Sequence, residues 1–153
     1  YAQLTRLPTP QTRPVPIRPL FEHVIVLLGA ERVQLDADAD CVCLADPSQL
    51  EQVLVNLVRN AQEATAANTG EITARWRDGT VGVEIEIEDW GTGIANPNNL
   101  FVPFFTTKPN GSGIGLPLCR QIMENHQGYI QVGNADDHQG CLVRLNLPAA
   151  TAH

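Results

Sequence analysis

Apolar residues recur at helical spacing after Asp46, where they form one stripe along a predicted helix. Asp46 is a capping residue, Pro47 suits the first turn, and Gln49 stands where a capping box needs it. We therefore expect an amphipathic helix that ends near Ala67. The apolar stripe consists of Leu50, Val53, Leu54, Leu57, Val58, Ala61 and Ala64.

Two further segments have the pattern of shorter helices. The first runs from Pro19 for about three turns, with Gly29 at its far end. The second is predicted over residues 114–127, and Gly128 is expected to close it.

Alternation of apolar and polar residues predicts strands. In residues 80–88 apolar residues alternate with Gly82 and three glutamates, so this strand has a core side and a water side. Its hairpin partner is residues 71–77, around a turn at Asp78-Gly79. The remaining predicted strands are residues 31–36, 41–45, 129–134 and 141–147. Helices that alternate with hairpins imply the α+β class: a two-layer α/β sandwich with one mixed, mostly antiparallel sheet and helices on one face.

Composition sets the scale. The chain has 153 residues, which suits one domain, and its net charge of −7 argues against binding to nucleic-acid phosphates. No apolar run approaches the ~18 residues of a membrane span.

The chain begins with Tyr1 rather than Met, so we expect a fragment of a longer protein, and residues 1–16 hold enough proline to be a linker or extended arm. The four cysteines lack the spacing of a zinc site and are expected to be reduced thiols, buried in the fold.

The long helix carries the first candidate for chemistry. Asn56 and Asn60 are one turn apart at the edge of the apolar stripe, with Arg59 and Glu63 on the same flank. An amide oxygen is a suitable ligand for Mg²⁺ beside phosphates. Two ordinary solvent-facing amides would give the same pattern.

Two glycine-rich segments are the next candidates. Residues 89–93 (DWGTG) follow a buried strand, so the Asp89 carboxylate can accept hydrogen bonds from a flat ligand that the glycines let approach. Residues 111–115 (GSGIG) open a helix, whose N–H groups and dipole suit a phosphate, although the spacing is not that of a P-loop. An acidic turn and a flexible hinge are the alternatives.

Between these segments lies an aromatic stretch, residues 100–108 (LFVPFFTTK). It holds three of the four phenylalanines and Lys108, the single lysine of the chain. Phenylalanines in a loop are unfavourable unless they dock. We interpret the stretch as the anchored base of a mobile lid over residues 95–112.

Together these segments resemble the catalytic, ATP-binding domain of bacterial sensor histidine kinases, in the superfamily that also holds gyrase, chaperone and mismatch-repair ATPases. The sequence QVLVNLVRNAQEA resembles the N box, DWGTGI the first glycine box and LFVPFFTTK the F box. GSGIGLPLCRQIMENHQGYIQV resembles the second glycine box and the following strand. The resemblance covers residues 15–148. The FTTK sequence and the short lid are most similar to those of nitrogen-regulation-type kinases.

The resemblance implies roles for individual residues. Asn60 would ligate Mg²⁺, Asn56 would lie close to the phosphates, and Asp89 would accept a hydrogen bond from the adenine amino group. Hydrolysing members carry a water-activating Glu where this chain has Asn56, and an amide cannot act as a general base, which favours transfer over hydrolysis. Asn56 is thus the candidate catalytic residue. The implied ATP-binding set is Asn56, Arg59, Asn60, Asp89, Gly91, Gly93, Ile94, Phe105, Thr107, Lys108, Gly111, Ser112, Gly113, Ile114, Gly115 and Leu116.

The implied function is donation of the γ-phosphoryl group of Mg-ATP to a histidine on a separate helical domain. None of His23, His126, His138 and His153 lies in a phospho-acceptor motif, so that domain is expected before a linker, residues 1–16. His126 is expected to be structural. The catalytic domain would span residues 17–148 and the tail residues 149–153.

The implied partners are the dimerisation domain of a homodimeric parent and the receiver domain of a response regulator, in a two-component system. We expect a monomeric fragment, a cytoplasmic location, and a parent that is cytosolic or membrane-anchored.

Trp90 and Cys141 depart from the residues usual in the family. Two alternatives stay open: a protein serine kinase of the anti-sigma-factor kind, and a nucleotide-binding module without transferase activity.

Overall fold

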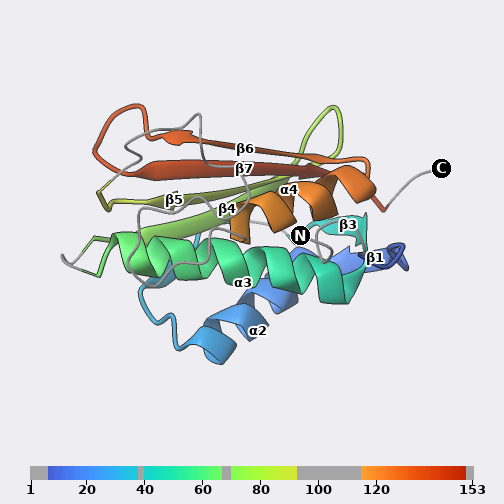
Figure 1. Ribbon diagram of the computed structural model, residues 1–153, viewed down its shortest axis with the longest axis horizontal. Coiled ribbons are helices and arrows are strands. Elements are labelled where there is room, and N and C mark those ends of the chain that lie inside the picture. The colour runs from blue at the N-terminus through green and yellow to red at the C-terminus, as the bar shows by residue number, and fades with distance from the viewer. Residues whose placement is uncertain (1–6, 38–39, 67–69, 93–114, 151–153) are drawn as a thin grey trace.

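The structure is a computed structural model, which describes residues 7–37, 40–66, 70–92 and 115–150 (Figure 1). Helices and strands alternate along these ranges. In chain order they are β1 (Arg13–Pro16), α2 (Ile17–Leu28), β2 (Val33–Leu35), β3 (Val42–Ala45), α3 (Pro47–Ala64), β4 (Ile72–Asp78), β5 (Val83–Asp89), α4 (Gly115–Asn125), β6 (Tyr129–Asn134) and β7 (Cys141–Leu147). No helix in the described part is long and apolar enough to cross a membrane.

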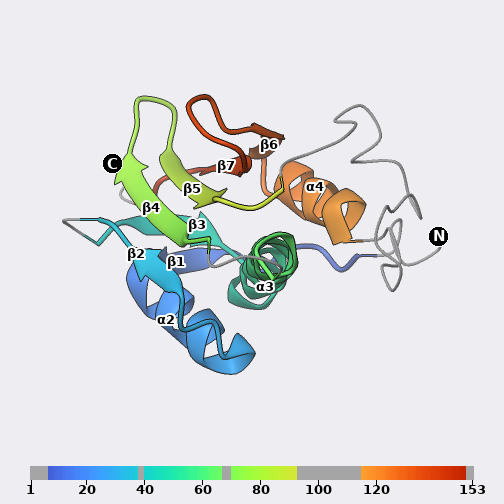
Figure 2. The ribbon, with the colours of Figure 1, turned by 90° about the vertical axis from the view of Figure 1, so that its left-hand side faces the viewer.

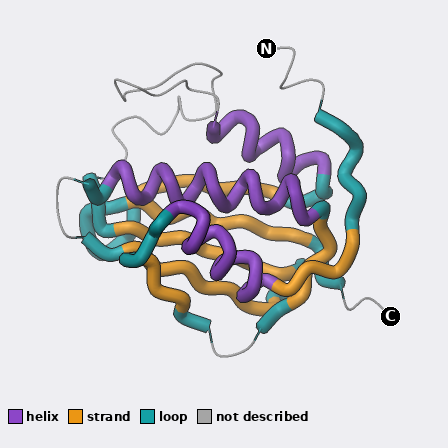
Figure 3. The backbone as a smooth tube through the Cα atoms, turned by 90° about the horizontal axis from the view of Figure 1, so that it is seen from below, coloured by secondary structure: helices purple, strands orange, loops and turns teal. Residues whose placement is uncertain are grey.

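Within the described ranges the main sheet has five strands, in the order β2-β4-β5-β7-β6. Of the described strands in this sheet, only β2 pairs in parallel, with β4, and the other three pairings are antiparallel. The three helices cover one face of the sheet, with α3 between α2 and α4 (Figures 2 and 3). The predicted α+β sandwich, with its mixed, mostly antiparallel sheet, is therefore confirmed.

A second, two-stranded sheet was not predicted. β1 lies in the proline-rich arm and pairs with β3 in antiparallel orientation, so residues 13–16 of the predicted linker belong to the fold. On its other edge β3 meets the segment after β7, through a bridge between Cys43 and Ala149 and a bond from Leu44 N to Pro148 O (2.9 Å). The structure therefore adds a small second sheet to the predicted one, and β3 connects this small sheet to the segment after β7.

Local chemistry explains the start of α3. The Asp46 carboxylate accepts hydrogen bonds from Ser48 N (3.0 Å) and Gln49 N (3.2 Å), as an N-cap should. The predicted capping box is wrong in its second half, because the Gln49 side chain donates instead to Pro8 O (3.0 Å). The backbone N–H of Asp46 donates instead to His126 Nε2 (3.0 Å). His126 thus accepts the hydrogen bond that the Gln49 side chain would accept in a capping box.

The ends of the helices differ slightly from prediction. α3 ends at Ala64, three residues early, with Thr65 as its cap. α4 ends at Asn125, and Gln127, rather than Gly128, adopts the left-handed conformation (φ 60°) after it. Gly128 N still closes the helix by donating to Met123 O (2.9 Å).

The core fills the space between the main sheet and the helices. Phe21 of α2 stacks on Trp76 of β4, with ring centroids 5.4 Å apart. In β5 the apolar residues face this core and the glutamates face outward, as the alternation predicts. Cys41, Cys43 and Cys119 are buried, Cys141 is half-buried, and all four are free thiols. The fully buried large side chains include Ile17, Leu50, Leu54, Ile72, Ile85, Ile122, Met123, Leu145 and Leu147.

Candidate nucleotide-binding site

The site begins at Asp89, the last residue of β5. Its side chain is only 5% exposed, and its Oδ1 accepts hydrogen bonds from Gly91 N (2.9 Å) and Cys141 N (3.3 Å). Both bonds that the described residues make to this carboxylate end on Oδ1. Oδ2 is therefore the oxygen that a bound group can use.

The environment of Asp89 raises the pKa of its carboxyl above the ordinary value of 3.8. Burial is the main cause, and it outweighs the opposing effect of the backbone hydrogen bonds from Gly91 and Cys141. A ligand that donates a hydrogen bond to Oδ2 would favour the ionised form. Such a ligand would compensate part of the desolvation that the fold imposes on this group.

Two glycines allow the backbone to close around Asp89. A Cβ on Gly91 would lie 2.5 Å from Ala64 O, so the turn after β5 packs directly on the end of α3. A Cβ on Gly140 would lie 1.9 Å from Asp89 O, and Gly140 has a φ of +155°. These contacts place Asp89 between α3 and the turn that joins β6 to β7.

The α3 residues that were predicted to lie near the phosphates come earlier in the helix than its contact with Gly91. Asn56 and Asn60 are half-buried and Arg59 is exposed. Asn56 Nδ2 contacts Cys119 Sγ of α4 (3.8 Å), which leaves its amide oxygen for another partner. Gly115, the first residue of α4, faces Asn56, because a Cβ on it would lie 3.9 Å from Asn56 Cγ.

The neighbour of Asn56 is a neutral thiol. Burial raises the pKa of Cys119 to about 12, although the hydrogen bond from Asn56 acts in the opposite direction. Leu116 is half-buried and packs against the core at the start of α4. The structure thus brings Asn56 of the first candidate segment close to Gly115, the last residue of the third.

The described part of the site has two ends. Asp89 and Gly91 lie at the C-terminal end of α3, where Gly91 packs on Ala64. Asn56, which Gly115 of α4 faces, lies eight residues before Ala64, about 12 Å along the axis of α3. The other predicted site residues lie outside the described ranges, as does the predicted lid over residues 95–112. They are Gly93, Ile94, Phe105, Thr107, Lys108, Gly111, Ser112, Gly113 and Ile114.

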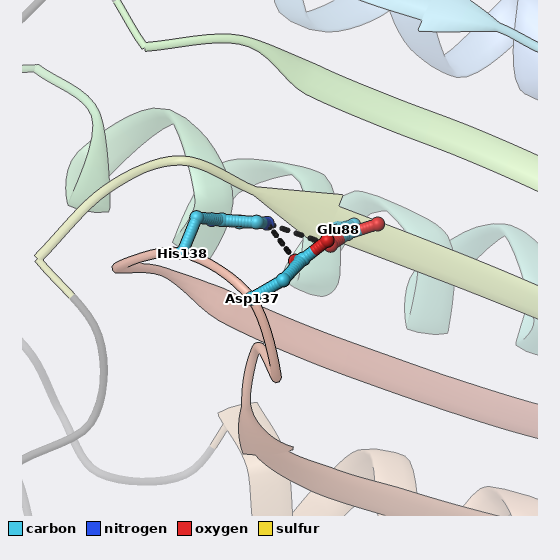
Figure 4. Close-up of side chains that lie close together, drawn as sticks. All are labelled: Glu88, Asp137 and His138. Carbon is cyan, nitrogen blue, oxygen red and sulfur yellow. Dashed lines mark hydrogen bonds and ion pairs between the residues drawn. The ribbon is translucent and has the colours of Figure 1, made fainter.

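Sequence reasoning missed a cluster beside Asp89. His138 Nε2 lies 2.7 Å from Glu88 Oε2 and 3.8 Å from Asp137 Oδ1 (Figure 4). The His138 ring also stacks on Trp90, with centroids 4.1 Å apart and planes 6° apart. Trp90 stood out only as a departure from the family, and His138 only as a histidine outside any acceptor motif. The register of β5 against β7, which pairs Asp89 with Cys141, could have brought these residues together.

Charge holds this cluster together. Ligating atoms of Glu88, Asp137 and His138 lie within 4.8 Å of one another, but both oxygens of Glu88 already accept bonds. Glu88 Oε1 accepts from Arg75 (2.6 Å), and Oε2 from His138. Burial alone would raise the pKa of Glu88, but the hydrogen bonds from Arg75 and His138 outweigh it and lower the pKa. The hydrogen bond to Gln139 O and the bond to Glu88 raise the pKa of His138.

His126 has the structural role that the sequence suggested. It is buried at the end of α4, with Nδ1 2.8 Å from Ile122 O and Nε2 accepting from Asp46 N. These contacts require the proton on Nδ1. The ring therefore fastens the end of α4 to the start of α3 and takes no part in the candidate site.

Comparison with known proteins decides the family. The model of the family described as "Histidine kinase-, DNA gyrase B-, and HSP90-like ATPase" matches residues 45–151. The chain belongs to this family. Its ATPase domain is 41% identical over 123 residues to the sensor protein FixL of Bradyrhizobium diazoefficiens, covering 78% of the chain and 24% of FixL.

Further comparisons place this ATPase domain among the sensor kinases. It is 35% identical over 114 residues to the sensory histidine kinase/phosphatase NtrB of Klebsiella oxytoca, covering 67% of the chain and 33% of NtrB. The nucleotide-free catalytic domain of histidine kinase ThkA has the same fold, with a TM-score of 0.79 and 31% identity over 91% of this chain and 96% of that one. The resemblance seen in the sequence is confirmed, and the nitrogen-regulation type is consistent with the NtrB match. The chain spans about a quarter to a third of the length of these two curated relatives.

Proposed function

We propose that this chain binds Mg-ATP and donates its γ-phosphoryl group to a histidine on a separate helical domain of a two-component sensor kinase. The family supports ATP binding. Full-length ShkA, solved in complex with AMPPNP, supports it further, with a TM-score of 0.81 and 26% identity over 99% of this chain. The observation that carries the proposal is the buried Asp89 carboxylate, whose Oδ1 is held by two backbone N–H groups.

Asp89 would recognise the base. Adenine presents an amino group at its edge, and this group would donate a hydrogen bond to Oδ2. Because Oδ1 is fixed by Gly91 and Cys141, the carboxylate does not need to reorient when the base arrives. Gly91 packs directly on Ala64 at the end of α3, so the turn whose N–H holds Oδ1 is itself fixed against that helix.

The phosphates would lie toward Asn56, Asn60 and the start of α4. An extended nucleotide can span the roughly 12 Å of helix axis between Ala64, which Gly91 contacts, and Asn56. Asn60 is half-buried on the same helix face as Asn56, and its amide oxygen suits Mg²⁺, which needs few protein ligands beside phosphates. Asn60 would hold the metal, which would supply positive charge to neutralise the phosphates. Arg59 and Lys108 are the proposed phosphate partners, and residues 95–112 the proposed lid.

The residue at position 56 favours transfer over hydrolysis. Asn56 cannot take a proton from water, and its N–H group is engaged by the neutral thiol of Cys119. In the proposed reaction an imidazole nitrogen attacks the γ-phosphorus, and the bond to the bridging oxygen breaks. Its electron pair leaves with ADP, and the other ring nitrogen then releases its proton to solvent. This domain contributes positioning and charge neutralisation.

The proposed partners are the parent's own helical acceptor domain and a response regulator receiver domain. ThkA has been solved in complex with the response regulator TrrA, with a TM-score of 0.76 and 28% identity over 92% of this chain. We also propose a homodimeric parent, and a cytoplasmic location for this domain.

The test uses this chain with and without the acceptor domain of its parent. Calorimetry should detect ADP binding that Mg²⁺ strengthens. With γ-labelled ATP the chain alone should stay unlabelled, and the added acceptor domain should acquire acid-labile phosphate. Stable label on this chain, acid-stable label on the acceptor, or a failure to bind ADP would each overturn the proposal.

A further inference from the structure

We propose that His138 is a positioning residue for nucleotide recognition: it clamps the turn between β6 and β7 to the end of β5 and so holds the Asp89 carboxylate in place. This inference rests on the proposed nucleotide site. We call His138 with Glu88 and Trp90 the His138 clamp (Figure 4 draws Glu88 and His138).

The clamp holds both chain neighbours of Asp89. His138 bonds to Glu88, the residue before Asp89, and its ring stacks on Trp90, the residue after it. Successive side chains of a strand point to opposite faces, so Glu88 lies on the outer face of the sheet and Asp89 on the helical side. The bond between His138 and Glu88 therefore lies on the opposite face of the sheet from the Asp89 carboxylate, and the clamp does not cover the side where the base is proposed to bind.

The same turn also touches Asp89 itself. Cys141 N, three residues after His138, donates to Asp89 Oδ1, and Gly140 packs on Asp89 O. The Gln139 side chain donates to Thr92 O (3.2 Å), which adds a third link between this turn and the segment after β5. The bond from Cys141 is the longer of the two bonds to Oδ1, at 3.3 Å against 2.9 Å. A turn that moved outward would weaken this bond first and let the carboxylate rotate.

The strength of the clamp depends on the charge of His138. Nδ1 faces Gln139 O (3.0 Å) and Nε2 faces Glu88 Oε2, and both partners are acceptors. A ring that donates from both nitrogens is an imidazolium, so deprotonation removes one of the two bonds. Among the described residues, the charged groups facing the ring are Glu88 and Asp89 of β5 and Asp137 of the turn, and Arg75 of β4 holds the other oxygen of Glu88.

These contacts fix the sign of the pH dependence. The pKa of His138 is raised above its ordinary value of 6.5. The stabilisation by the charged ring is therefore complete below pH 6.5 and is lost as pH rises through the raised pKa. If the clamp positions Asp89, nucleotide affinity falls over the same range.

The experiment measures ADP affinity by calorimetry in EDTA, from about pH 5.5 to about pH 9, a range that spans the histidine titration. His138→Ala should weaken binding about fivefold to tenfold at the acidic end, a typical coupling between sites, and less at the alkaline end. His138→Arg keeps a positive charge beside Glu88 and a planar group against Trp90, so its ADP affinity at acidic pH should stay near that of the wild type. Because arginine does not titrate in this range, the ADP affinity of this variant should not show the fall that deprotonation of His138 causes in the wild type. His23→Ala removes an exposed histidine that pairs with Glu51 on the helical side and is the matched control.

The readouts separate the clamp from the proposed site and from a folding defect. The ionisation of ADP itself affects all variants equally. The ratio of each variant's ADP affinity to that of the wild type at the same pH therefore reports the contribution of His138. Protonated imidazole quenches a stacked indole, so wild-type tryptophan emission should rise as pH rises, and it should lack this step in His138→Arg. Wild-type affinity and pH profile in His138→Ala, or no emission step in the wild type, would overturn the clamp. If Asp89→Asn also left ADP binding unchanged, the proposed site itself would be wrong.

Discussion

Replacing Asp89 with asparagine should separate nucleotide recognition from folding. In the wild type Oδ1 accepts from Gly91 and Cys141, and Oδ2 is left for the base. The amide introduced at this position would keep its oxygen toward the two backbone N–H groups, because its nitrogen cannot accept from them. The nitrogen would then occupy the position of Oδ2, where a donor would face the amino group of adenine.

The magnitude follows from these contacts. The variant loses one hydrogen bond to a charged group, worth about 1.5–3 kcal/mol, so ADP affinity should fall roughly 10-fold to 150-fold. Stability should not fall, because burial raises the pKa of Asp89 and so disfavours its ionised form in the fold. A neutral amide removes that unfavourable burial of charge. The free energy of unfolding at neutral pH should therefore be unchanged or slightly higher.

Calorimetry with ADP and denaturant unfolding measure the two quantities on the same protein. Asp136→Asn, which removes an exposed carboxylate from the turn between β6 and β7, is the matched control and should change neither. Asp89→Ala is the contrasting variant, because it leaves Gly91 N and Cys141 N without their acceptor and should destabilise the fold by about 1–3 kcal/mol. Unchanged ADP affinity in Asp89→Asn would refute the assignment of this carboxylate to the base.

Three other predictions test separate parts of the molecule. Asn60→Ala should reduce the gain in ADP affinity that Mg²⁺ gives over EDTA, by calorimetry, and should leave affinity in EDTA nearly unchanged; an equal Mg²⁺ effect in both proteins would count against this ligand. ADP should increase hydrogen-exchange protection in residues 95–112, and protection that ADP does not alter would show that this segment is no nucleotide lid. The lowered pKa values of Glu86 and Glu88 mean that their stabilising contribution is present above pH 4.5 and is lost as pH falls through those lowered values. Acid unfolding of Glu88→Gln should therefore show a smaller pH dependence than that of the wild type, and an identical dependence would contradict it.

The parts of the fold that were predictable have strong local signals. The start of α3 follows from Asp46 and Pro47, and the alternation in β5 gives its buried face directly. Asp89 stands out as a candidate because a carboxylate and glycines follow a strand. Each of these features depends on neighbours in the sequence, which a pattern can reveal.

The features that the sequence did not reveal depend on contacts between distant segments. β1 is rich in proline and pairs with β3, about thirty residues later, with only one buried residue of its own. His126 replaces Gln49 in capping α3 across eighty residues. The His138 clamp needs the register of β5 against β7 and the path of the turn between β6 and β7. No local propensity encodes any of these.

The position of β3 has a mechanical consequence. Cys43 pairs with Val15 of β1 on one edge and with Ala149 on the other, and both neighbours run antiparallel to β3. The incoming and outgoing segments of the chain therefore run parallel to each other, with β3 between them. Forces that pull these two segments apart along the chain act parallel to the strands, so the hydrogen bonds on both edges of β3 bear the load together. This is shear loading, in which several bonds must break at once, whereas a hairpin pulled open at its ends loses its bonds one by one.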